Sequence, residues 1–519
     1  LYDEHTWGAH MSATDPDALL TLDQWEVKEG FARNAHQSGK RLLHVAASRH
    51  ALEWYAEGRE VVVHNPHSWP VGGVVTVEYA RSEQPVDPRS GQSLPERVLK
   101  LTASQVTAEL PLLEPLPGNA YRRFPLVPRG SSPAGPAPQA VQGDGPLAIE
   151  NEYLRVTIDP QRGCATSLVD RRTGREYVDG TDQFGLGQFV YANGGEGTRL
   201  ISNQADLPPG NPRLDATFRL QAAEREDYPY GSTVRLNGLV EGGELTVEWT
   251  LRRGSRYLDL GYRYQKEERR AKEAVYVAFP LDIPGARVRS DNQTGWIDWE
   301  RDALPGACQE WLPLQTGILV DAGGEIAHIA SPDVPLFCVR DVVLGRWPRD
   351  LDLTGGRLFS YVLNNYWHTN YKGTQGGETT WRYRLAAGED ISEASAYRAG
   401  WEVRRPAYAH RMSHQDFRRA REPYADPSGG RLAVVQSEGD DIVLQSLRPA
   451  PGGAGYLARF QDTGGAGGTV TLEIPGRPVA RAWRTDLLGG GAEEVPVAAG
   501  TVSVDLPAWG LATVRFELA

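Results

Sequence analysis

The sequence contains few cysteines. Only Cys164, Cys308 and Cys338 occur in 519 residues, and none of them forms a Cys-x-x-Cys pair. Disulfide frameworks and cysteine zinc sites both need paired cysteines at short spacings, so neither is supported here. The scarcity of cysteine favours a reducing compartment, and we expect a cytoplasmic location.

Long apolar runs and an excess of positive charge are also missing. No apolar run approaches the roughly 18 residues that cross a bilayer, so no membrane span is predicted. Acidic residues number 67 against 55 basic ones, which gives a net charge of −12. Proteins that bind nucleic acids usually carry a basic patch or stripe, whereas the basic residues here are scattered. The composition therefore disfavours a nucleic-acid partner and favours a neutral ligand.

The chain also lacks an initial methionine and a secretory signal segment. It opens with Leu1-Tyr2-Asp3, without the charged and then apolar stretch of a signal peptide. We expect the sequence to begin within a longer protein. Its length exceeds the 250 to 300 residues at which single cores stop growing, so several domains are predicted.

One long helical pattern is present near the start. Asp15-Pro16 and the Thr21/Gln24 pair resemble helix start signals. The apolar residues that follow recur at spacings of mostly three, four or seven: Leu22, Trp25, Ala32, Ala35, Leu42, Val45 and Ala46. A long helix is predicted, and its apolar stripe needs partner helices. We expect those partners mostly upstream of Leu1.

After Gly58 the pattern is mainly β, with short alternating strands separated by turn signals and no amphipathic helix of useful length up to about Arg405. Residues Leu245 to Leu251 show the alternation plainly. The expected parts are a piece of a helical bundle (1–58), a small β domain (59–127), a Pro/Gly/Ser/Ala-rich linker (128–146), a large antiparallel β-sandwich (147–425) and a C-terminal β domain (426–519). The fold class is therefore mainly β.

Three stretches together resemble glycoside hydrolase family 38, the retaining α-mannosidases that use a catalytic zinc ion. Asp3-Glu4-His5-Thr6-Trp7-Gly8-Ala9 resembles the segment in which a histidine completes the zinc site. Val61-Val62-Val63-His64-Asn65-Pro66-His67-Ser68-Trp69 is similar to the V-x-N-P-x-S-W opening of the first β domain. Asn364 to Tyr371, followed by Gln375-Gly376-Gly377, is close to a bacterial branch. Matches at 149–156 and 273–280 keep the family order.

The resemblance implies that this chain is the C-terminal portion of such an enzyme, with a galactose-mutarotase-like large sandwich. The barrel domain, with the nucleophilic aspartate and most zinc ligands, would lie before Leu1, so no catalytic residue is expected here. Retaining hydrolysis needs a nucleophile and an acid about 5 to 5.5 Å apart. This polypeptide alone is therefore expected to be inactive. A homo-oligomer is compatible with the resemblance.

The resemblance further implies that His5 is a zinc ligand. By residue type alone, His5 could instead be a helix-start histidine bonded to a backbone carbonyl. Glu4 departs from the histidine that better-known animal members have before the ligand. Glu4 is a candidate substrate contact, or else a surface charge. Trp7 is predicted either to stack on a sugar face or to pack on the bundle.

The segment from Asn364 to Tyr371 concentrates three aromatic and three amide side chains, which suits a loop that stacks on sugars and reads hydroxyls. We predict that Asn365, Trp367 and Asn370 contact substrate. The alternative is a polar hairpin whose asparagines cap their own turns.

Two further functions remain open from the sequence. One is a non-catalytic carbohydrate-binding or scaffold protein built of β-sandwiches, which would need no metal ligand at His5. The other is a lyase or epimerase that shares the large sandwich, although no complete catalytic set is recognisable within these residues.

Overall fold

The structure is a computed structural model. It describes residues 11–12, 14–52, 59–130, 138–141, 143, 145–194, 213–342, 351–365, 372, 374–412, 429–437 and 441–519, with the side chains of 48–52 excepted. The described chain divides into two compact units, Leu1–Arg41 with Pro136–Ile391 and Leu42–Gly135 with Ser392–Ala519. Each unit is considered on its own below.

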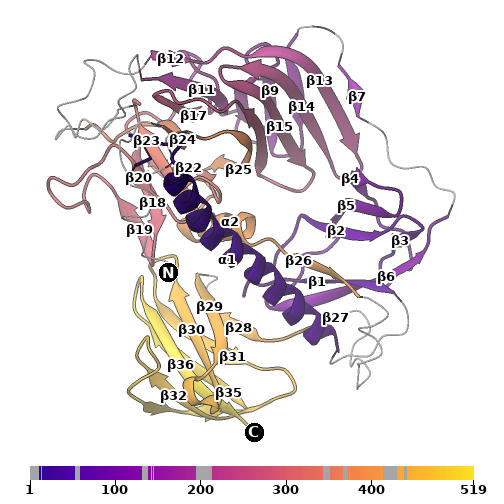
Figure 1. Cartoon of the computed structure of the whole chain (residues 1–519). Coiled ribbons are helices and arrows are strands. Elements are labelled where there is room, and N and C mark those ends of the chain that lie inside the picture. Colours follow the sequence, from indigo (N-terminus) through magenta and orange to yellow (C-terminus); the bar gives the residue numbers. More distant parts are fainter. Residues whose placement is uncertain are drawn as a thin grey trace. The chain divides into compact units, whose positions relative to one another are not determined.

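The long helix predicted from the sequence is present as α1 (Leu19–Leu52), drawn in indigo in Figure 1. Thr21 is buried in its first turn, where the hydroxyl donates to the backbone oxygen of Asp15 at 3.0 Å. The apolar residues of the helix are largely exposed, Leu22 by 43% and Leu42 by 69%. The predicted stripe is therefore not covered within the described chain.

The first unit is built on two large antiparallel sheets. The larger has the order β19-β18-β21-β22-β25-β16-β15-β14-β13-β7, and the other the order β12-β11-β17-β24-β23-β20. The strands of the larger sheet are β7 (Gln139–Ala140), β13 (Arg219–Tyr228), β14 (Gly231–Val240), β15 (Gly243–Arg252), β16 (Leu258–Lys266), β18 (Arg287–Asn292), β19 (Gly295–Asp298), β21 (Gly317–Ala322), β22 (Glu325–Ala330) and β25 (Gly377–Gly388). Those of the other are β11 (Gln188–Asn193), β12 (Arg213–Asp215), β17 (Glu273–Pro280), β20 (Leu312–Pro313), β23 (Leu336–Val339) and β24 (Arg357–Asn364).

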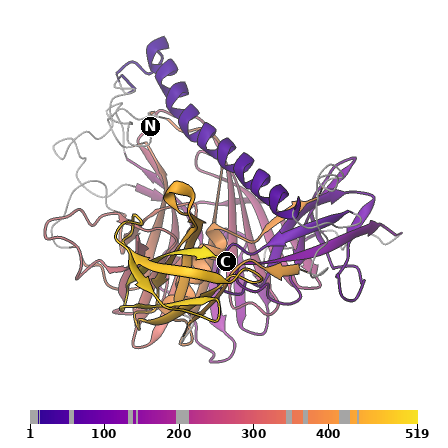
Figure 2. The same ribbon diagram turned by 90° about the horizontal axis from the view of Figure 1, so that it is seen from below.

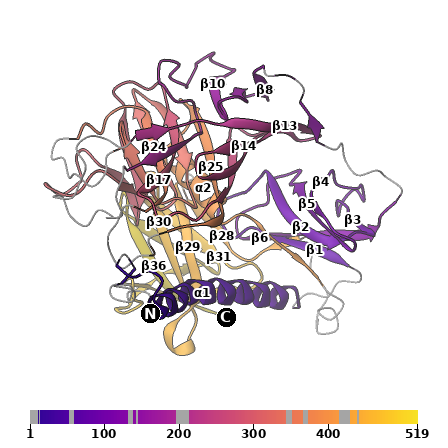
Figure 3. The same ribbon diagram turned by 45° about the horizontal axis from the view of Figure 1, so that its top comes forward.

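A third, small sheet in the same unit consists of β8 (Leu147–Glu150), β9 (Leu154–Asp159) and β10 (Cys164–Asp170). One core cluster joins all three sheets, and its largest members include Trp249 and Trp381, both fully buried. Tyr262 stacks on Trp381 with ring centroids 5.1 Å apart. Side chains alternate between the two faces of a strand, so β14 to β16 each bury every second residue in this core. Figure 3 shows the strands from another side.

The second unit joins segments that are far apart in the sequence. One sheet has the order β26-β1-β6-β27, with β3 also paired to β6, and a second has the order β2-β5-β4. These strands are β1 (Glu60–His64), β2 (Val74–Ala80), β3 (Glu83–Pro85), β4 (Arg97–Leu101), β5 (Gln105–Pro111), β6 (Ala120–Pro128), β26 (Tyr408–Arg411) and β27 (Gly429–Arg431). β26 pairs with β1 across more than 300 residues of sequence, with Val62 opposite His410.

The last strands of the second unit form two more antiparallel sheets, drawn in orange and yellow in Figure 2. They are β28 (Val434–Ser437), β29 (Ile442–Pro449), β30 (Tyr456–Asp462), β31 (Gly468–Glu473), β32 (Val479–Thr485), β33 (Glu493–Val495), β34 (Val497–Ala498), β35 (Thr501–Leu506) and β36 (Leu511–Leu518), with a 3-10 turn η2 (Pro451–Gly453). Phe460, Phe516 and Leu472 are buried in a common core. The prediction of a mainly β fold with several antiparallel sheets is confirmed.

A second helix, α2 (Glu393–Arg404), contradicts the expectation that no amphipathic helix of useful length lies before Arg405. Its start is a capping box in which the backbone N–H of Ser395 donates to the Ser392 hydroxyl at 3.1 Å, and the N–H of Ser392 donates back to Ser395 at 2.9 Å. A serine in place of the usual Glu or Gln at the third position hid this signal in the sequence.

Among the described residues, no helix is long and apolar enough to cross a membrane.

The turn after β1 contains a buried histidine. His67 stacks on Trp69, with ring centroids 4.4 Å apart, and its Nε2 lies 2.8 Å from the backbone oxygen of Arg405. Burial lowers the pKa of His67 to about 4, although the bond to Arg405 opposes this shift. Burial likewise lowers the pKa of His64 to about 4.

These two histidines make stability depend on pH. The unfolded chain binds a proton near pH 6.5 and the folded chain only near 4, so each histidine reduces the free energy of unfolding as pH falls through that window. The slope is at most about 1.4 kcal/mol per pH unit for each. Urea unfolding at pH 7 and pH 4.5 should show a smaller loss for His67→Gln than for the wild type. Equal losses would contradict the shifted pKa.

Candidate functional site

Of the six site residues predicted from the sequence, one lies in the part of the chain that the structure describes. Asn365 follows directly after β24. Glu4, His5, Trp7, Trp367 and Asn370 lie outside the described residues. Their roles remain predictions. Structural information on the candidate site comes from the surroundings of Asn365 and from the described residues that flank the two predicted segments.

Asn365 is 3% exposed and is bound to the turn between β16 and β17. Its backbone N–H donates to the backbone oxygen of Glu273 at 2.7 Å. Its Nδ2 donates to Oε1 of Glu273 at 2.9 Å and to the backbone oxygen of Arg269 at 3.3 Å. The Oδ1 of Asn365 is buried and has no hydrogen-bond partner among the described residues. These hydrogen bonds therefore fix the position of Asn365, from which the chain continues to Trp367 and Asn370.

Glu273 is the centre of a buried polar network. It is fully buried at the start of β17, and its carboxylate forms an ion pair with Nζ of Lys266 at the end of β16. The Tyr191 hydroxyl donates to Oε2 of Glu273 at 2.5 Å. Lys266 also donates to the backbone oxygen of Glu267 at 2.9 Å. Burial, followed by the bond to Glu273, raises the pKa of Tyr191. A buried charge needs such partners, since an isolated one is strongly disfavoured.

The turn between β16 and β17 is held by a second set of charges nearer the surface. Arg269 donates to Glu267 at 2.7 Å and to Glu241 at 2.5 Å. Hydrogen bonds to Glu241 and then to Glu267 raise the pKa of the Arg269 guanidinium. The Tyr264 hydroxyl donates to the backbone oxygen of Glu241 at 2.9 Å. The turn to which Asn365 bonds is thus held by the buried ion pair of Glu273 and by the ion pairs of Arg269 nearer the surface.

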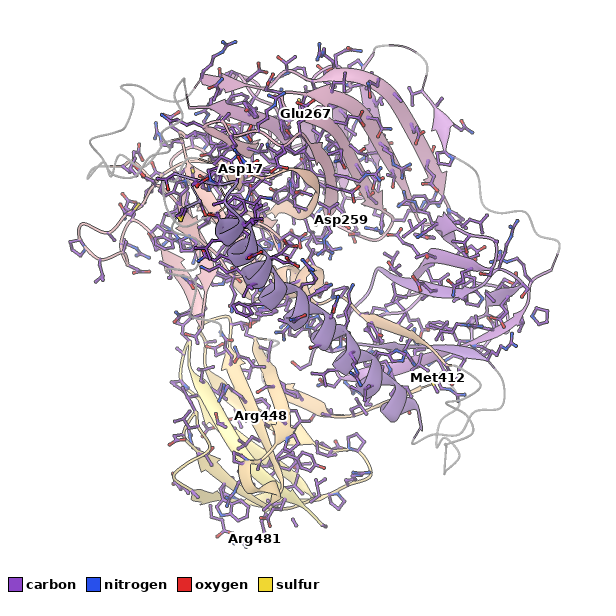
Figure 4. The ribbon with its side chains drawn as sticks, viewed as in Figure 1. Asp17, Asp259, Glu267, Met412, Arg448 and Arg481 are labelled. Atoms are coloured by element: carbon purple, nitrogen blue, oxygen red, sulfur yellow. The ribbon has the colours of Figure 1, made fainter. Side chains whose placement is uncertain are left out.

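The residues that lead into α1 contact the same turn. Asp17 forms an ion pair with Arg270, with Oδ2 of Asp17 2.9 Å from Nη1 of Arg270. The hydrogen bond from Arg270 lowers the pKa of Asp17. Figure 4 labels Asp17 just before α1 and Glu267 just after β16. The segment that follows Trp7 in the sequence therefore reaches the turn that holds Asn365.

A second contact joins α1 to the far flank of the predicted loop. Nζ of Lys372 lies 5.6 Å from the centre of the Trp25 ring, within the range of a cation–π interaction. Nε1 of Trp25 donates to the Ser12 hydroxyl at 2.8 Å. The flanks of the two segments that the sequence singled out, Asp3 to Ala9 and Asn364 to Tyr371, are thus brought together at one end of β16 and β25.

The described residues do not hold a metal site by themselves. No group of three or more His, Cys, Asp or Glu side chains that could hold a metal ion is found among them. Glu273 is already occupied by Lys266, Tyr191 and Asn365. A zinc ion bound through His5 would need its other ligands from residues outside the described part of the chain.

Sequence reasoning did not identify Lys266, Glu273 and Tyr191. Glu273 is the one charged residue of the otherwise apolar and fully buried strand β17, and a charge in such a strand requires a buried partner. Its partner Lys266 ends an alternating strand. The pairing of these two residues depends on tertiary structure. The sequence therefore indicates that Glu273 needs a partner, but it does not indicate that Lys266 is that partner.

Comparisons with known proteins identify similar sequences and folds. The sequence profile of the glycosyl hydrolases family 38 C-terminal domain matches residues 149–317. Among solved structures, an α-mannosidase from Enterococcus faecalis V583 aligns over 96% of this chain and 60% of its own, at 14% identity and a TM-score of 0.67. A protein in the glycosyl hydrolase family 38 from Enterococcus faecalis aligns over 96% and 62%, at 15% identity and a TM-score of 0.68.

A galactose mutarotase-like protein from Lactobacillus casei ATCC 334 aligns over 47% of this chain and 100% of its own, at 11% identity and a TM-score of 0.28. The comparison with curated proteins found no match. The chain spans about three fifths of the length of the two Enterococcus structures.

The fold is that of the β-rich part of a glycoside hydrolase. More specifically, residues 149–317 match the C-terminal domain of glycosyl hydrolase family 38, and the family resemblance drawn from the sequence is confirmed for this part of the chain.

Proposed function

We propose that this chain is the C-terminal part of a retaining, zinc-dependent α-mannosidase-type glycoside hydrolase that acts on α-linked mannosides or related glycans. The observation that carries the proposal is the match of residues 149–317 to the family 38 C-terminal domain. The fold shared with the two Enterococcus structures supports it. We propose a cytoplasmic location, since Cys164, Cys308 and Cys338 all have free thiols.

In this proposal His5 supplies one zinc ligand, and the remaining ligands and the nucleophile come from a barrel domain that precedes Leu1 in the intact protein. The exposed apolar residues of α1 support a partner of this kind, because Leu19, Leu20, Val27 and Leu42 are each more than half exposed. Isolated exposed leucines are ordinary, but a helix that leaves several exposed is typical of an interaction face.

The role proposed for this chain's own residues is to position the sugar. Trp367 offers a stacking face, and Asn370 and Glu4 offer polar atoms for hydroxyl groups. Trp7 offers a second aromatic ring. The ion pair of Asp17 with Arg270 and the contact of Trp25 with Lys372 support a shared site, since they join the flanks of both segments. Buried Asn365 holds the start of the loop.

The test uses the intact enzyme and an aryl α-mannoside. Trp367→Ala and Asn370→Ala should each lower kcat/KM by about ten-fold to hundred-fold, because each removes roughly 1 to 3 kcal/mol of transition-state binding. The melting temperature should change little. Steady-state kinetics and thermal unfolding are measured on the same samples, with Glu300→Gln as a control at an exposed position of the sandwich.

A loss of melting temperature with normal kcat/KM per folded molecule would remove the loop from the site and leave it a capped hairpin. Residues 1–519 alone should show no turnover, since the proposal places the nucleophile elsewhere. Chelator-sensitive turnover by this polypeptide would show that the active site has been misplaced.

A further inference from the structure

A cavity of about 510 Å³ lies at the other end of the large sheet from the candidate functional site. Three turns line it: residues 170–177 after β10, residues 322–325 between β21 and β22, and residues 389–390 after β25. β25 has 12 residues and runs from Gly377, which pairs with Lys266, to Gly388, which pairs with Ile326. At about 3.3 Å per residue, the two places are separated by on the order of 35 Å.

The two guanidinium groups of the cavity are already held by carboxylates. Arg172 donates to Asp390 at 2.8 and 3.3 Å and to Asp170 at 3.0 Å. Arg175 donates to Glu325 at 2.9 Å and to Asp282 at 3.0 Å. These bonds fix both side chains across separate turns. They also occupy the forks that would otherwise bind a phosphate or a carboxylate, so an anionic ligand is disfavoured.

The carboxylates, in turn, do not form a cation site. No group of three acidic, histidine or cysteine side chains suited to a metal ion is found among the described residues. Asp170, Glu325 and Asp390 are each bound to a guanidinium. Asp170 is buried, but Glu325 and Asp390 are partly exposed and still have lone pairs that a hydroxyl group can approach, because a carboxylate accepts about four hydrogen bonds. A neutral ligand rich in hydroxyl groups matches this surface.

Glu389 is the acceptor that the cavity leaves open. It is exposed, it lines the cavity, and no residue of the described chain donates a hydrogen bond to its side chain. Gly388 beside it lies close to the carboxylate of Asp390, which lines the cavity. A Cβ at this position would lie 2.9 Å from Oδ1 of Asp390, and the φ of +155° is one that side chains rarely adopt. The backbone is thus shaped around the pair of Asp390 with Arg172.

We propose that this cavity binds a neutral saccharide, as a glycan contact separate from the candidate functional site. The acceptors of Glu325 and Asp390 are held in place by the Arg–carboxylate pairs, and Glu389 supplies the free acceptor. The inference rests on the proposed function only for the choice of an α-linked mannoside as the probe.

The test is isothermal titration calorimetry of residues 1–519 with a linear α-linked mannotriose. The expected dissociation constant is on the order of 1 mM. Glu389→Gln, which keeps the size of the side chain, should weaken binding about five-fold to ten-fold, the effect of one charge-assisted hydrogen bond. Glu300→Gln, at an exposed position elsewhere in the same unit, should bind as the wild type does. Gly388→Ala should abolish binding, with circular dichroism as a check of folding.

No heat with mannotriose up to about 20 mM, or equal dissociation constants for the wild type and Glu389→Gln, would overturn the proposal. Binding of inorganic sulfate in competition with mannotriose would overturn the neutral class of ligand. Because the titration measures binding and not hydrolysis, normal kinetics of the Trp367 and Asn370 variants would count against the proposed active-site loop while leaving this result standing.

Discussion

Replacing Glu273 by alanine is expected to lower the free energy of unfolding of the chain by about 3 to 5 kcal/mol. The substitution leaves Lys266, whose side chain is 1% exposed, as an uncompensated charge in the interior of the sandwich. It also removes the acceptors of Tyr191 and Asn365. Breaking a buried pair costs far more than the pair itself contributes, because the remaining ion has lost its water without a replacement. Urea unfolding followed by tryptophan fluorescence measures the change.

The double variant Lys266→Met with Glu273→Leu separates this cost from a simple loss of packing. Removing both charges should recover most of the stability, since apolar residues of similar volume can replace a buried ion pair. Glu244→Ala is a suitable control on β15, because Glu244 is exposed and should change the stability by no more than about 0.5 kcal/mol. If Glu273→Ala unfolds within that margin of the wild type, the buried network does not exist as described.

The sandwich was predictable because local sequence carries its pattern. The residues from Leu245 to Leu251 alternate between apolar and polar, and the structure places the apolar ones of β15 in the core. The turn signals between strands were equally readable. Gly242 and Gly243, for example, both have positive φ between β14 and β15. Helix α1 followed in the same way from its spacing of apolar residues.

Pairing between distant segments was not predictable in this way. β26 lies next to β1 although Tyr408 and His64 are separated by more than 300 residues. Nothing in the sequence of either strand identifies the other strand as its partner. Pairing between strands so far apart in the sequence is determined by the whole core rather than by a local pattern. The same reason hid the pairing of Lys266 with Glu273, which the register between β16, β17 and their neighbours determines.

The candidate site was predicted in pieces, without the arrangement that joins them. The family resemblance selected His5 and the loop after Asn364, and the structure adds that the flanks of both meet the turn between β16 and β17, through Asp17 with Arg270 and Lys372 with Glu268. Asn365 was predicted as a substrate contact from its residue type. Its bonds to Glu273 and Arg269 support a positioning role, which an asparagine in a sequence does not reveal.

Replacing His5 by alanine in the intact enzyme should remove both the bound zinc and the activity on an aryl α-mannoside. In the proposed function His5 is one of few protein ligands, and a zinc site that loses one of three or four ligands loses most of its affinity. Metal content is measured by atomic emission after gel filtration, and turnover is measured on the same fractions. The matched control is His36→Ala, because His36 is an exposed histidine on α1.

The two variants separate a metal ligand from a structural histidine. His36→Ala should keep full zinc content and normal turnover, which excludes a general effect of losing an imidazole near the helix. If His5 only bonds a backbone carbonyl at the start of the helical region, His5→Ala should lower the melting temperature and leave the zinc stoichiometry unchanged. Added zinc distinguishes these cases further, because a weakened ligand set regains activity at high metal concentration by mass action. Unchanged zinc content in His5→Ala would end the assignment of this residue as a ligand.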